Sequence, residues 1–331
     1  MEPETWGSKD AYFARNPDEV SGAEESRAVS SRLKALLQDC APDARERVNA
    51  AVRDWNQSVR EQLRAETALR LSSADKQVSV PVRVVDGVPP PLWVLNDIPD
   101  HVLRLVLLRG WFASSVRGVQ LLRQRRSDVI DFLAKGHLPS DAVPSVAELQ
   151  QLGRLLEVLS DELQNVDLFG KIWEKPVDWL GAYFYRKPVI EIYWVSIGLA
   201  AARYQVDVQA LTYVVLAHEL AHAYTHRGFD IDGHGWDTAA FAKTSGYIVE
   251  GLAQYYTRAL CHKSKERYPA ASAAFLALLE HQRPGPYADF EGWMESESNP
   301  GERLRQTMLE VRRRGVKDYE GFRALLDGDA Q

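Results

Sequence analysis

The chain has 331 residues, of which 45% are hydrophobic and 26% charged, and its formal net charge is −6. A chain of this length and composition can bury a sizeable core, in two domains or in one large domain with an extension. The acidic balance argues against a nucleic-acid partner, because phosphate recognition needs an excess of lysine and arginine. We also expect no membrane partner, since the most apolar stretch, residues 102–116, is too short to span a bilayer.

The amino-terminal segment, residues 1–28, is polar and acidic, which predicts a mobile tail. It does not begin with basic residues followed by an apolar run, as a secretory signal would, so we expect a cytoplasmic protein. The two cysteines, Cys40 and Cys261, lie far apart and outside any Cys/His cluster. They are therefore expected to be free thiols of a reducing compartment, with a structural disulfide as the alternative.

Residues 29–165 are expected to form a mostly helical amino-terminal region. A helix is predicted near residues 31–38, and a longer one opens at Asp43, which has capping-box spacing to Glu46. Apolar residues then recur at steps of three and four. This stripe predicts a helix face packed on its own core, with a partner-binding face as the alternative. The residues of the stripe are Val48, Val52, Trp55, Val59 and Leu63.

A short β segment interrupts these helices near residues 77–95. Residues 77–85 alternate as a strand does, and Pro81 within them indicates an edge strand. Two further helices are expected, from Pro99 to residue 123 and from residue 145 to residue 165; Ser145 and Glu148 give the latter a capping box. Helices of this region are candidates for contact with a protein partner.

Residues 166–331 are expected to form a catalytic domain. Two β-rich runs, 180–185 and 189–194, are separated by Arg-Lys-Pro and predict an antiparallel hairpin. Nearly everything after the hairpin has helical periodicity. We therefore expect an α+β fold that is predominantly helical and has a small antiparallel sheet.

An HExxH motif lies in a helical pattern after the hairpin, at His218, Glu219 and His222. Residues four apart lie on one face of a helix, so both imidazoles can reach one metal ion. Glu219 is rotated by about 100° and can act as general base toward a water at that metal. This is the pattern of two zinc ligands and a catalytic carboxylate.

The surroundings of the motif predict a buried helix, because apolar residues flank it on both sides. Asp207 is the expected N-cap and Gly228 the expected stop. Buried histidine and glutamate side chains need partners, and a metal supplies them. The alternative is a core helix whose histidines are satisfied by hydrogen bonds.

A catalytic zinc site needs a third protein ligand, and Glu250 is our candidate. It lies in a second apolar helical pattern, residues 247–256, where Gly251 is expected to permit close helix approach. Gln254, one turn later, could orient a ligand histidine through a hydrogen bond.

These residues resemble the gluzincin clan of metallopeptidases, to which thermolysin belongs. The resemblance rests on His218-Glu-Leu-Ala-His222, on the later Glu250-Gly-Leu-Ala and on the upstream hairpin, and it covers roughly residues 178–260. It implies a zincin-like domain, zinc as cofactor, Glu250 as third ligand and a hairpin edge strand that binds substrate. Thermolysin-like enzymes carry an aspartate at the position of Gln254.

Other residues compete for roles at this site. His234 could be the third ligand, as in SprT-like proteases, and the acidic loop around it offers Asp230, Asp232 and Asp237. His226 continues the histidine face by one more turn, where a helix-end or ligand-orienting role is expected. Candidates for stabilising an oxyanion are Tyr255, Tyr256 and His234.

The sequence thus predicts a zinc-dependent metallopeptidase that acts on a peptide or protein substrate, with Glu219 as catalytic base and His218, His222 and Glu250 as zinc ligands. Two alternatives stay open. One is a zincin-fold binding or scaffold protein with little catalysis, and the other is a zinc hydrolase of a non-peptide amide.

Overall fold

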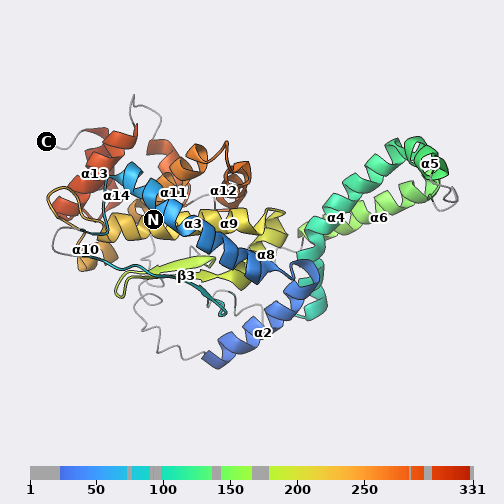
Figure 1. Ribbon diagram of the computed structural model, residues 1–331, viewed down its shortest axis with the longest axis horizontal. Helices are drawn as coiled ribbons and strands as arrows, with labels where there is room; N and C mark the ends of the chain where they lie inside the picture. Colours follow the sequence, from blue (N-terminus) through green and yellow to red (C-terminus); the bar gives the residue numbers. More distant parts are fainter. Residues whose placement is uncertain are drawn as a thin grey trace.

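A computed structural model describes residues 23–72, 77–89, 92, 98–135, 143–165, 179–282, 285–293 and 300–328. The described chain is predominantly helical, with one small sheet (Figure 1). None of its helices is both long and apolar enough to cross a lipid bilayer. The helices before the hairpin are α2 Ala23–Cys40, α3 Ala44–Thr67, α4 Asp100–Gln124, α5 Arg126–Lys135 and α6 Val146–Asn165. Those after it are α8 Trp194–Tyr204, α9 Val208–Arg227, α10 Thr238–Ala242, α11 Gly246–Lys263, α12 Pro269–His281, the 3-10 helix η3 Asp289–Trp293, α13 Pro300–Arg314 and α14 Tyr319–Asp327.

The sheet has three strands in the order β1-β3-β2. Strands β2 (Gly181–Phe184) and β3 (Val189–Tyr193) form the predicted antiparallel hairpin, which is confirmed. Strand β1 (Val82–Val85) lies at the sheet edge, as Pro81 predicts, but it pairs with β3 in parallel. The sheet is therefore mixed, and the expectation of a purely antiparallel sheet was wrong. The reason is topological: β1 enters from a distant segment, and only sequential strands joined by a tight turn must run antiparallel.

The predicted helices near residues 31–38 and after Asp43 are confirmed as α2 and α3. Helix α2 begins at Ala23, so residues 23–28, which were expected to belong to the tail, are helical; residues 1–22 lie outside the described residues. Asp43 is the N-cap of α3, but its side chain makes no capping hydrogen bond, which contradicts the expected capping box with Glu46. Its φ and ψ of −97° and 10° depart from the extended conformation that a side-chain cap requires.

The apolar stripe of α3 is part of the core, as the first of the two interpretations predicts. Val48, Val59 and Leu63 are fully buried, and α3 packs along α9. Residues on both sides of the predicted domain boundary at residue 165 therefore share one hydrophobic core. This face of α3 is occupied within the chain and is not free for another protein.

Helix α9, which carries the HExxH motif, lies at the centre of the molecule, between the sheet and the helices α3, α11 and α12 (Figure 1). Asp207 caps it as predicted, because its carboxylate accepts a hydrogen bond from the Ala210 amide at 2.8 Å. Gly228 ends it, also as predicted. A β-carbon at Gly228 would lie 2.4 Å from the Tyr224 carbonyl oxygen, so no larger residue fits this exit from the helix. The motif is thus fixed at both ends.

Candidate metal centre

Three ligand-type side chains converge between α9 and α11. His218 and His222 project from successive turns of α9, and Glu250 projects from α11. The Nε2 atoms of the two histidines lie 3.0 Å apart, and each lies 3.2 Å from Oε2 of Glu250. All three side chains are buried, with exposed fractions of 7%, 4% and 3%. The structure therefore brings the predicted metal ligands together.

The spacing of these three atoms fits a tetrahedral ion. Zinc binds nitrogen and carboxylate oxygen at about 2.0–2.2 Å, so donor atoms on a tetrahedral ion lie about 3.3 Å apart. Two imidazole nitrogens and one carboxylate also match the ligand set of catalytic zinc, which leaves a fourth position open. Among the residues that the structure describes, His218, His222 and Glu250 are the one group of three ligand-type side chains close enough together to hold a metal ion. The residues present fit zinc.

The competing loop residues have other contacts. Asp230 accepts hydrogen bonds from the backbone amides of Asp232 and His234. The carboxylates of Asp230 and Asp232 also form ion pairs with Arg313. Asp237 caps α10 by accepting a hydrogen bond from Ala240 N. The His234 side chain is exposed. None of these residues joins the cluster of His218, His222 and Glu250, so the loop is a structured connector.

The candidate general base, Glu219, is 2% exposed and lies against the edge strand β2. Gly181 makes this approach possible. A β-carbon there would lie 2.8 Å from Cγ1 of Val215, closer than real β-carbon contacts allow, and 3.0 Å from Cγ of Glu219, which is a tight contact. The hairpin therefore packs against Glu219 through a glycine, a role that was not predicted for Gly181.

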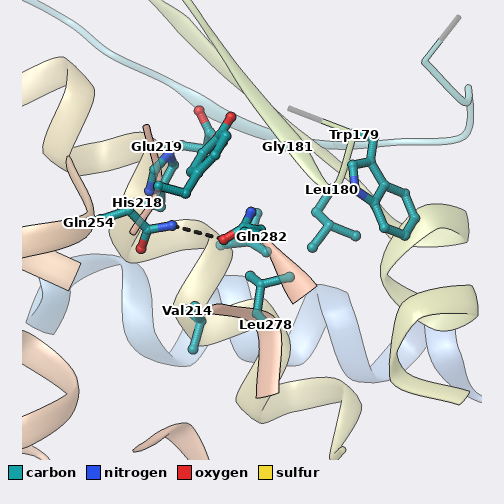
Figure 2. A pocket seen from close by; sticks show the side chains of 11 residues that line it. Trp179, Leu180, Gly181, Val214, His218, Glu219, Gln254, Leu278 and Gln282 are labelled. Carbon is teal, nitrogen blue, oxygen red and sulfur yellow. Dashed lines mark hydrogen bonds between the residues drawn. The ribbon is translucent and has the colours of Figure 1, made fainter. Parts of the chain in front are cut away.

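A small cavity of about 40 Å³ opens beside His218 and Glu219 (Figure 2). This volume suffices for a few water molecules. Apart from those two side chains, two glutamines, Trp179 and Tyr287, the lining residues are aliphatic or glycine. Glu219 is the one carboxylate among the described lining residues, which are Trp179, Leu180, Gly181, Val214, Val215, His218, Glu219, Gln254, Leu278, Gln282 and Tyr287.

One expectation about α11 was wrong, and another was confirmed with a different neighbour. Gln254 donates from Nε2 to Oε1 of Gln282 at 3.1 Å and lines the cavity, whereas we expected it to orient a ligand histidine (Figure 2). Gly251 does leave room for a close neighbour, but the neighbour is the indole of Trp293, which a β-carbon would approach to 2.2 Å. In both cases the partner comes from a later segment that helical spacing alone does not place.

Tyr255, Tyr256 and His234 are not among the residues that line the cavity. Tyr255 and Tyr256 pack edge-to-face on each other, with ring centroids 5.3 Å apart, and burial raises the pKa of Tyr256. Tyr287 lines the cavity instead, and its ring centroid lies 5.9 Å from that of His218. Tyr287 was not predicted from the sequence, because it lies in a non-helical segment outside the motif's pattern.

His226 is buried and takes part in a bridge between elements, away from the three converging atoms. Its Nδ1 lies 3.0 Å from the Tyr183 hydroxyl on β2, and its Nε2 lies 3.1 Å from the hydroxyl of Thr238 on α10. Its ring also stacks on Phe241. Burial, together with the positive charges of Arg227 and Arg312, lowers the pKa of His226 to about 3. It is therefore a neutral structural residue at the end of α9, as the helix-end interpretation predicts.

Comparisons with protein families, with curated proteins and with solved structures found no match to this chain.

Proposed function

We propose that this protein is a zinc-dependent metallopeptidase with a zincin-like catalytic domain of the gluzincin type. The observation that carries the proposal is the convergence of His218, His222 and Glu250 at distances suited to zinc, next to the buried carboxylate of Glu219. A cluster of this kind without a metal would bury a carboxylate among imidazoles for no structural gain, because buried polar groups cost free energy unless they are satisfied.

The proposed roles follow from position. His218, His222 and Glu250 would hold the ion, which when bound acidifies a water and polarises a carbonyl group. Glu219 would accept the proton of the attacking water and then deliver it to the nitrogen of the leaving amine. Its burial beside Gly181 keeps the carboxylate in one place and away from bulk solvent. Tyr287, which lines the cavity, would contact the substrate carbonyl.

A peptide is favoured over another amide by the strand beside the site. β2 is an edge strand, and in the described sheet its outer edge pairs with no other strand. An extended peptide can add to such an edge through main-chain hydrogen bonds. Because Gly181 of this strand contacts Glu219, a peptide bound there would pass the proposed catalytic base. The expected substrates are therefore extended peptide segments.

The test combines metal analysis with hydrolysis of a peptide library by the purified full chain. We expect one zinc per chain and cleavage that a chelator abolishes and added zinc restores. Glu219→Gln should keep the zinc and lose hydrolysis by about 100-fold or more, since it removes the general base. A zinc-loaded wild type that cleaves no peptide would contradict the peptidase, and Glu219→Gln with full turnover would remove Glu219 from its role.

A further inference from the structure

Helices α4 and α6 form a hairpin that extends away from the rest of the molecule, with α5 at its far end (Figure 1). We call residues 100–165 the arm. One side of α6 packs on α4: Leu149, Gly153, Leu156 and Ser160 are buried there, and Gly153 lies next to Val119. This side is the interface that a two-helix hairpin requires.

A second apolar side of α6 faces solvent. Leu152, Leu155 and Val158 are 43%, 56% and 58% exposed, and at 100° per residue they cover about 120° of the helix surface. Together with the packed side, apolar residues occupy more than half of the circumference of α6. One apolar stripe suffices for a helix with one neighbour, so α6 has the surface of a helix with two neighbours.

Apolar side chains are also exposed at the far end of the arm. Helix α5 has no buried residue among its ten, and Phe132 on it is 74% exposed. Leu121, near the end of α4, is 59% exposed. Large apolar side chains gathered on one surface mark an interaction site, whereas scattered ones do not. The three residues of the α6 stripe are gathered in this sense, because their helical spacing places them on one side of the helix, and this side is where a covering partner would bind.

The charges of the arm indicate which partner. Helix α4 carries four arginines against one aspartate, a net charge of +3. Helix α6 carries four acidic residues against Arg154, a net charge of −3. Among the described side chains, Asp161 and Glu162 of α6 have no charged partner. Opposite charges on the two helices of one arm make a second arm, rotated by a two-fold axis, electrostatically complementary.

We propose that the arm is a dimerisation element whose occupant is a second copy of this chain. Two arms related by a two-fold axis form a four-helix bundle, in which the exposed side of each α6 packs on the other arm. An anionic membrane surface fits less well, because the acidic residues of α6 lie near the apolar stripe. A foreign partner of a single charge would match only one of the two helices.

The test is the oligomeric state of the full chain, measured by sedimentation equilibrium over a range of concentrations. We expect a dimer, and we expect the double variant Leu155→Glu, Val158→Glu to raise the dimer Kd by at least ~100-fold, since each change occurs twice across a two-fold interface. Both side chains are exposed in the single chain, so circular dichroism and thermal unfolding of the variant should match those of the wild-type monomer.

Leu276 on α12 supplies the matched control. It is 62% exposed but lies outside the arm, so Leu276→Glu should leave the dimer intact. A charge-reversed pair, Asp161→Lys with Glu162→Lys, should also weaken the dimer, and this effect should shrink at high salt. A wild-type chain that stays monomeric at all concentrations overturns the proposal. So does a dimer that resists the double variant, or one that Leu276→Glu disrupts equally.

Discussion

Replacement of Glu250 by alanine tests the metal centre most directly. Oε2 of Glu250 lies 3.2 Å from both histidine nitrogens, so the change removes one of three proposed protein ligands. Loss of a residue that only orients a ligand typically costs 10–100-fold in metal affinity, so loss of a ligand should cost at least ~100-fold. With zinc at 1,000 times the wild-type Kd, binding stabilises the wild type by about 4.1 kcal/mol and the variant by only about 1.4 kcal/mol.

The assay is thermal unfolding with and without zinc, together with zinc titration against a competing chelator. For 331 residues the unfolding entropy is about 0.7 kcal/mol/K, so the difference of about 2.7 kcal/mol corresponds to a zinc-induced rise in Tm that is roughly 4 °C smaller in the variant. Gln254→Ala is the matched control, because Gln254 is equally buried on the same helix but bonds to Gln282 and not to a ligand. If Glu250→Ala binds zinc as tightly as Gln254→Ala does, Glu250 is not a ligand.

Three further predictions concern the surroundings of the site. Gly181→Ala should displace Glu219, lowering hydrolysis by about 100-fold and the free energy of unfolding by ~1–3 kcal/mol. Gly118→Ala is the control, because a β-carbon there meets nothing within 4 Å. It should leave hydrolysis unchanged, and it should leave the free energy of unfolding unchanged or raise it slightly. The pKa of His226 in the folded chain lies far below its value of about 6.5 in the unfolded chain. As pH falls through 6.5, the imidazole is therefore protonated in the unfolded chain but not in the folded one, and the folded state loses stability from about pH 6.5 downward. Urea unfolding should show the wild type losing ~2 kcal/mol more than His226→Phe between pH 7 and pH 5; equal losses would contradict the low pKa. Finally, Gln282→Glu adds a second carboxylate to a cavity that now has one, so in a peptide library cleavage should shift about tenfold toward lysine and arginine side chains, whereas Gln282→Met should show no such shift.

Much of the local structure followed from the sequence, because periodicity and capping act over a few residues. The helix with the HExxH motif, its cap at Asp207 and the capping box of Ser145 and Glu148 are all present; the last pair bonds in both directions, at 2.7 and 3.2 Å. The antiparallel hairpin was equally local. The capping box at Asp43 failed because the backbone there is not extended, and backbone angles at a helix start depend on what precedes the helix.

Contacts between distant segments were harder to predict. The parallel pairing of β1 with β3, the packing of Trp293 on Gly251 and the place of Tyr287 in the cavity all join residues from separate elements. No period or spacing encodes such pairs, because they depend on how whole helices and strands pack. The same holds for the exposed side of α6, because apolar spacing alone does not tell which of the described helices packs on it.

The sequence by itself determined that His218 and His222 share one helix face with Glu219 beside them, because 3.6 residues per turn leave no other arrangement. Only the tertiary structure decided that Glu250, and not His234, completes the cluster. Both residues follow the motif in the chain, and the choice between them depends on α11 packing against α9 while the loop of His234 is held at the surface by Arg312 and Arg313.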